Sequence, residues 1–169
     1  ADAEGAAHEA EDAAKDETEG AEKPEELEVA YIIRGQKNII NRMKALIEKT
    51  QKEAMLFISY PTVFKELKQP LLEANKTRKI NLKIAMTPKV FEEEGRINLD
   101  EIKLLRCPID PVGMLISDRN TLLTLANWSS EVATLTNDQN LIRIIREYYD
   151  KSSCCTPVLP TEKKKHALK

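Results

Sequence analysis

The side chains best suited to chemistry in this 169-residue chain are carboxylates, because imidazoles are absent from its centre. The two histidines, His8 and His166, stand near opposite ends of the chain. A folded active site between them contains no imidazole, which argues against Ser-His-Asp, Cys-His and most zinc chemistry. Among the carboxylates, Asp118 follows a short apolar run, where functional residues gather, although shaping a turn with Asn120 is the more common role. We predict no catalytic residue and no metal site.

Phosphate-binding glycine loops are also missing. Gly35, Gly95 and Gly113 are isolated from one another, so none belongs to a Gly-x-Gly-x-x-Gly or a Walker A motif. We interpret Gly35 as a tight turn from a strand into a helix, with a phosphate at the helix N-terminus as the alternative. We therefore expect no nucleotide and no other cofactor.

The cysteines and the apolar runs bear on location. An odd cysteine count with one adjacent pair is a poor disulfide framework. We interpret Cys107 as a core residue and Cys154 and Cys155 as thiols, which fits a reducing, cytoplasmic environment. No apolar run approaches the roughly 20 residues of a membrane helix, so we expect no membrane contact.

Charge divides the chain into three segments. Residues 1–28 contain 12 acidic and 2 basic residues, and almost no apolar residue larger than alanine. Such a segment cannot bury enough surface to offset its ordering entropy, so we predict a disordered acidic tail over residues 1–27. We predict one folded domain over residues 28–150 and a flexible basic tail over residues 151–169, which contain Lys163–Lys165.

Short apolar runs alternate with amphipathic stretches in the first half of the domain. Apolar residues at a spacing of three and four predict helices over Gln36–Gln51 and Thr62–Asn75, and Pro70 is expected to kink the second. Compact apolar runs predict the strands between and around them. These strands are Glu28–Ile33, Ala54–Ser59 and Asn81–Met86.

In the second half of the domain, strands and helices no longer alternate. Thr87–Asp100 is predicted as a loop with one helical turn, followed by the strand Glu101–Cys107. Gly113–Ser117 and Thr121–Ala126 are predicted as a hairpin, and a capping box at Thr136–Gln139 begins a helix that ends at Asp150. We therefore predict an α/β fold, a mostly parallel sheet flanked by amphipathic helices, with a C-terminal hairpin and helix.

This fold predicts where a ligand would bind. In open α/β sheets, ligands bind at the loops that follow the carboxyl ends of parallel strands. Provided that the strand before Asp118 is parallel to the others, one rim gathers a guanidinium, a phenol and a carboxylate, which suit a hydroxyl-bearing molecule such as a sugar. A solvated or dimer surface is the alternative. The predicted ligand-binding residues are Arg34, Tyr60, Asp118, Arg119 and Trp128.

Three segments resemble the effector domain of the TrmB family of archaeal transcription regulators. They are Tyr31–Ile40 with Ala54–Ser59, Pro111–Asp118 with Thr121–Trp128, and the closing Leu141–Tyr149. The resemblance covers roughly residues 28–150 and implies a phospholipase-D-like fold, effector sensing, often of sugars, and a homodimer. It also implies that DNA is bound only through a winged-helix domain, which residues 1–27 are too short and too acidic to form.

The phospholipase D signature, His-x-Lys-x-x-x-x-Asp, tests that resemblance. With Asp118 on the signature Asp, Pro111 stands at the His and Gly113 at the Lys. The nucleophile and the phosphate-binding group are both missing, so the resemblance implies a non-catalytic effector-sensing and dimerisation domain. The alternatives are a stand-alone phospholipase-D-like protein-interaction module, and an enzyme that uses Asp118 as a base.

Overall fold

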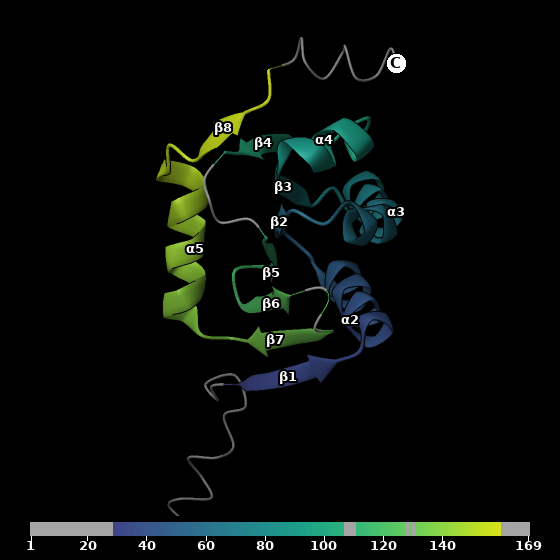
Figure 1. Ribbon diagram of the computed structural model, residues 1–169, viewed down its shortest axis with the longest axis vertical. Coiled ribbons are helices and arrows are strands. Elements are labelled where there is room, and N and C mark those ends of the chain that lie inside the picture. The colour runs from purple at the N-terminus through teal and green to yellow at the C-terminus, as the bar shows by residue number, and fades with distance from the viewer. Residues whose placement is uncertain (1–28, 107–110, 128, 130, 160–169) are drawn as a thin grey trace, which may run out of the picture.

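A single eight-stranded sheet organises the protein (Figure 1). The computed structural model describes residues 29–106, 111–127, 129 and 131–159. The strands are β1 (Ala30–Arg34), β2 (Glu53–Ile58), β3 (Asn81–Met86), β4 (Glu101–Leu105), β5 (Gly113–Ser117), β6 (Thr121–Asn127), β7 (Val132–Thr136) and β8 (Cys155–Pro157). Their order across the sheet is β1-β7-β6-β5-β2-β3-β4-β8.

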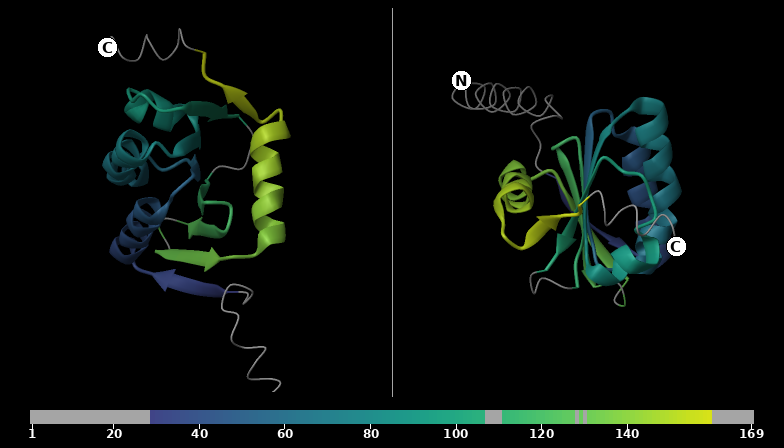
Figure 2. Two further views of the ribbon diagram at one scale, coloured as in Figure 1. Left: turned by 180° about the vertical axis from the view of Figure 1, so that it is seen from behind. Right: turned by 90° about the horizontal axis from the view of Figure 1, so that it is seen from above.

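Four helices pack on the two faces of this sheet. They are α2 (Gln36–Lys49), α3 (Pro61–Arg78), α4 (Pro88–Glu94) and α5 (Gln139–Lys151). Figure 2 shows α2, α3 and α4 on one face and α5 alone on the other, which makes three layers. The sequence predicts α2, α3 and α5 to within a few residues, and α3 continues through Pro70.

The prediction of a mostly parallel sheet is wrong. Only β2, β3 and β4 pair in parallel, whereas the five other pairings are antiparallel. Strand β1 is the reason for the error, because it precedes α2 and β2 in the chain but lies at the far edge of the sheet, beside β7. A strand-helix-strand pattern does not reveal whether its two strands become neighbours.

Alternating strand residues build two separate hydrophobic cores. The larger core lies under α2, α3 and α4 and includes Leu56, Ile84 and Leu115 from the central strands. The smaller core lies under α5, where Phe57 packs against Tyr149 with the ring planes at 87°. A period of two along each strand sends successive side chains to opposite faces, so both faces of β2 are buried.

Local geometry explains two turns. Gly35 has φ 91°, which confirms the tight strand-to-helix turn that the sequence predicts, since glycine adopts positive φ without a steric penalty. Asp118 and Arg119 have φ of 50° and 63° in the turn of the β5–β6 hairpin, which confirms the predicted hairpin. At the start of α5 the cap is Asp138, which accepts hydrogen bonds from the Asn140 and Leu141 amides.

Two of the strands are not predicted from the sequence. Val132–Thr136 forms β7 between β6 and β1, and Cys155–Pro157 forms β8 at the edge beside β4, inside the segment expected to be a tail. The interpretation of Cys154 as a thiol is wrong, because Cys154 is disulfide-bonded, whereas Cys155 is a buried free thiol. The predictions for residues 1–27, Cys107 and 160–169 lie outside the described residues.

Candidate functional site

The structure does not bring the predicted ligand-binding residues to one rim. Strands β1 and β2 point in the same direction, so Arg34 and Tyr60 follow the carboxyl ends of these strands on the same side of the sheet. Strands β7, β6 and β5 lie between them, however, and Tyr60 packs against the larger core with its hydroxyl buried. Arg34 and Tyr60 are therefore too far apart to contact one small ligand together.

Asp118 and Arg119 follow the carboxyl end of β5, which lies beside the amino end of β2, because the two strands are antiparallel. The predicted rim required the strand before Asp118 to be parallel to the others, and it is not. The Asp118 carboxylate accepts hydrogen bonds from the backbone amides of Gln51 at 2.9 Å, Lys52 at 2.8 Å and Glu53 at 3.1 Å. Burial tends to raise the pKa of Asp118, but these hydrogen bonds outweigh it and hold the pKa below its ordinary value. Asp118 thus fastens the start of β2 to the β5–β6 turn.

Glu53 is the centre of a charged cluster beside this turn. Its side chain is nearly buried, and its Oε2 accepts a hydrogen bond from Arg119 Nε at 2.9 Å. Lys83 Nζ lies 3.3 Å from Oε1 in an ion pair without good hydrogen-bond geometry, and Arg146 Nη2 lies 3.9 Å from Oε2. Burial tends to raise the pKa of Glu53, but Arg119 and Lys83 outweigh it and lower the pKa.

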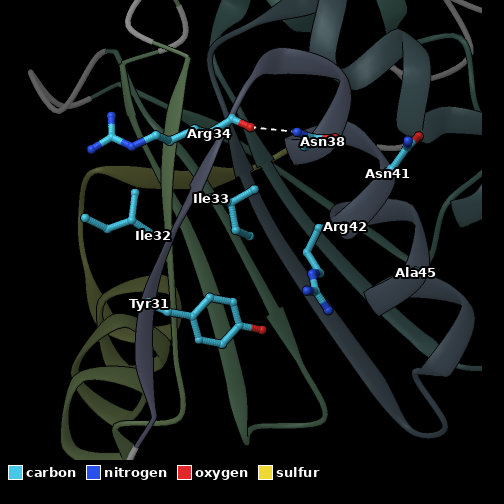
Figure 3. A pocket seen from close by; sticks show the side chains of 8 residues that line it. All are labelled: Tyr31, Ile32, Ile33, Arg34, Asn38, Asn41, Arg42 and Ala45. Carbon is cyan, nitrogen blue, oxygen red and sulfur yellow. Dashed lines mark hydrogen bonds between the residues drawn. The ribbon is translucent and has the colours of Figure 1, made fainter.

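A pocket of about 510 Å³ opens between β1 and α2 (Figure 3). The ring of Tyr31 faces Arg42, whose guanidinium carbon lies 5.8 Å from the ring centroid, a distance typical of a cation–π contact. Asn38 Nδ2 donates to the Arg34 carbonyl at 2.9 Å, whereas the Arg34 guanidinium and Ile32 point away on the other side of the strand. The pocket thus offers an aromatic face, a cation and amide groups.

Sequence reasoning missed most of these groups. Tyr31 stands within a predicted strand and Asn41 and Arg42 within a predicted helix, and no motif marks these residues as a site. Glu53 was missed because it immediately precedes an apolar run, although a carboxylate beside a fully buried strand is a signal for ion pairing. Trp128, the remaining predicted ligand-binding residue, lies outside the described residues.

Within residues 29–106, 111–127, 129 and 131–159, no three His, Cys, Asp or Glu side chains are grouped so that they could hold a metal ion. None of the helices that the structure describes combines the length and the apolar character needed to cross a membrane.

Comparison with protein families gives a match over most of the chain. The family model described as transcriptional regulator TrmB, EBD N-terminal subdomain, matches residues 29–153. A comparison with curated protein sequences gives no match.

Comparison with solved structures supports the phospholipase-D-like fold. NucT from Helicobacter pylori superposes with a TM-score of 0.62 at 15% identity, over 78% of this chain and 100% of that chain. Nuc from Salmonella typhimurium, a phospholipase D family member, gives a TM-score of 0.54 at 14% identity over 78% of this chain and 99% of its own.

TrmBL2, described as an archaeal chromatin protein with a novel mode of DNA binding, gives a TM-score of 0.54 at 21% identity. The match covers 86% of this chain and 62% of the TrmBL2 chain.

Proposed function

The chain belongs to the TrmB family of transcriptional regulators, whose effector-domain model matches residues 29–153, and from that membership we propose that it senses a small polar effector and pairs with a second copy of itself. The effector belongs to the hydroxyl-bearing class, such as a sugar. DNA is contacted through a winged-helix unit and not through the domain described here. A stand-alone protein-interaction module remains the second reading, which the absence of any saccharide binding would favour.

The pocket between β1 and α2 carries the effector proposal. Tyr31 presents an apolar ring against which the face of a sugar ring packs, and the side chains of Asn38, Asn41 and Arg42 offer donors and acceptors to its hydroxyls. The pocket replaces the predicted rim as the proposed effector site, because Tyr60, Asp118 and Arg119 contact neighbouring protein groups instead.

A thermal-shift titration with neutral mono- and disaccharides tests the effector site. We expect at least one saccharide to raise the melting temperature of the wild-type protein. Asn41→Ala and Arg42→Ala should abolish that shift, whereas Lys37→Ala, an exposed residue of α2 outside the pocket, should retain it. No shift with any saccharide would refute the sugar class, and an unchanged shift in both pocket variants would refute the site.

The free edge of β1 supports the dimer. Among the strands that the structure describes, β1 pairs with β7 alone, so its other edge presents backbone N–H and C=O groups. Ile32 is 58% exposed on the face of the sheet that α5 covers, and Ile144 on α5 is 61% exposed. An antiparallel pairing of β1 with β1 of a second copy would hydrogen-bond these backbone groups, and it is compatible with a two-fold symmetry axis.

The domain is proposed to be non-catalytic. Gly113 stands where the phospholipase D signature has its Lys, and a Cβ built there overlaps the Leu125 side chain. Pro111 stands where that signature has its His, and proline has no side-chain nucleophile. Turnover of bis(p-nitrophenyl) phosphate by the purified protein, lost in Asp118→Asn, would contradict this proposal and favour an enzyme.

A further inference from the structure

A second concave site lies on the α5 face, far from the β1–α2 pocket in the sequence. It is a cavity of about 330 Å³ between the β5–β6 turn and the first half of α5. Its lining consists of three guanidinium side chains, two amide side chains and one isoleucine. These residues are Arg119, Arg143, Arg146, Gln139, Asn140 and Ile142.

The three guanidinium groups are held from different directions. Arg119 donates through Nε to Glu53 at 2.9 Å, and Arg146 Nη2 lies 3.9 Å from the same carboxylate oxygen. Arg143 Nη2 donates to Asn140 Oδ1 at 3.5 Å, on the first turn of α5. A guanidinium carries five N–H donors in a planar fork, so each of these contacts uses only a part of its capacity. The remaining donors of the exposed Arg119 and Arg143 are available to a ligand in the cavity.

The lining of the cavity carries three positive charges and no carboxylate, whereas the acidic residues lie outside the lining. Glu53 is 7% exposed and is the carboxylate that pairs with Lys83, Arg119 and Arg146 together. Two neighbouring acids are already occupied, since Asp118 accepts three backbone amides and Asp138 caps α5. The exposed Glu147 follows on α5. The N-terminus of α5 adds the positive end of a helix dipole.

Arg146 lies deeper in the protein than the other two arginines of the cavity. Its Nε is buried and has no hydrogen-bond partner, although the Nη2 of the same group reaches Glu53. Buried donors of charged groups are almost always paired, because leaving one unpaired forfeits its hydration without compensation. This Nε has almost no accessible surface, so an anion in the cavity would contact the terminal nitrogens of Arg146 and would reach Nε only after a shift of the side chain.

We propose that this arginine pocket binds the phosphate group of a small phosphorylated molecule, of which a sugar phosphate is the nearest class. Guanidinium forks match phosphate oxygens in bidentate geometry, and Gln139 and Asn140 offer amides to adjoining hydroxyls. The site is a small open concavity of about 330 Å³, and the paired carboxylate of Glu53 contacts two of its arginines, whereas a polynucleotide needs an extended basic surface. The site is separate from the proposed neutral-sugar pocket and does not depend on it.

Isothermal titration with inorganic phosphate, pyrophosphate and glucose 6-phosphate, at constant ionic strength, tests the inference. We expect saturable binding in the wild-type protein, weakened at least tenfold in Arg143→Gln/Arg146→Gln. Because Arg143 is exposed, Arg143→Glu keeps the fold and should abolish binding on its own. Arg96→Gln, an exposed arginine outside the pocket, is the matched control and should bind as the wild type does.

The outcomes separate this inference from the proposed function. No saturable heat with any of the three phosphates, or equal affinity in wild type and Arg143→Glu, would overturn it. Tighter binding of duplex DNA than of glucose 6-phosphate, lost in the same variants and steeply salt-dependent, would overturn the small-molecule class in favour of a polynucleotide. The shift of the wild type by neutral saccharides should persist in Arg143→Glu, so the two proposals fail separately.

Discussion

At the scale of the residue, Asp118 shows how a predicted ligand-binding group becomes a structural one. Its carboxylate accepts three backbone amides from the segment that leads into β2, and its positive φ belongs to the hairpin turn. The sequence offered both roles, since Asp and Asn favour left-handed turn positions. Only the fold decides between them, because the donors come from residues more than sixty positions earlier in the chain.

Asp118→Asn should destabilise the protein by about 1 kcal/mol near neutral pH, because asparagine keeps the turn but accepts these amides less well. The pKa of Asp118 is lowered in the fold, so its contribution is present above the unfolded pKa, near the ordinary value of 3.8, and is lost as pH falls below it. Urea unfolding between about pH 3 and pH 7 should therefore show a shallower acid decline in the variant. Parallel curves for the two proteins would refute this role.

Gly113 is a position with no room for a larger side chain. A Cβ there overlaps Leu125, which is itself buried, so Gly113→Ala should destabilise the protein by about 1–3 kcal/mol. Leu125→Ala should cost energy alone but relieve the clash, which makes the two changes less than additive in a double-mutant cycle measured by urea unfolding. Strict additivity would contradict the proposed overlap.

At the scale of the element, prediction succeeded where a pattern is local. The 3.6-residue spacing of apolar side chains identified α2, α3 and α5, and compact apolar runs identified β2, β3 and β5. Strand β7 was missed although Val132–Thr136 alternates the buried Ala133 and Leu135 with Thr134 and Thr136, a pattern that itself favours a strand. Strand β8 has three residues and contains Pro157, which by itself favours no strand.

Strand β8 can be tested by two adjacent residues. Val158 is 7% exposed and its amide donates to the Ile102 carbonyl at 2.9 Å, whereas Leu159 is 60% exposed. Val158→Ala should destabilise the protein by about 1–3 kcal/mol, while Leu159→Ala should stay within about 0.5 kcal/mol of the wild type. Equal, small effects on the urea midpoint would indicate that this segment is a tail, as its composition suggested.

At the scale of the whole molecule, the candidate site depended on strand directions that no local pattern contains. The predicted rim required β5 to run parallel to β2. Because the pairing is antiparallel, Asp118 and Arg119 lie at the amino end of β2 instead of its carboxyl end. The two pockets likewise join elements distant in the sequence, such as the β5–β6 turn and α5. The family resemblance was recoverable from hydrophobic patterns, but the pocket residues were not.

The dimer is a prediction about the whole molecule. Multi-angle light scattering should give twice the mass of the chain at micromolar concentration. Ile32→Lys should shift the mass toward that of the monomer, because a charge on the face beside the β1 edge opposes burial in an interface. Leu159→Lys replaces a similarly exposed apolar residue at the other end of the sheet and should leave the mass unchanged. A monomer at all concentrations would refute the pairing.

The pairing of β1 with β7 has a further consequence during synthesis. Ala30 pairs with Thr136 and Arg34 with Val132, so the partner of an early strand is translated about a hundred residues later. At a typical elongation rate of roughly 5–20 residues per second, β1 remains without its partner on the nascent chain for on the order of 5–20 seconds. During that interval Tyr31 and Ile32 are exposed to other chains on the same polysome. Slower elongation between β6 and β7 therefore prolongs the period in which the nascent chain is most prone to aggregate.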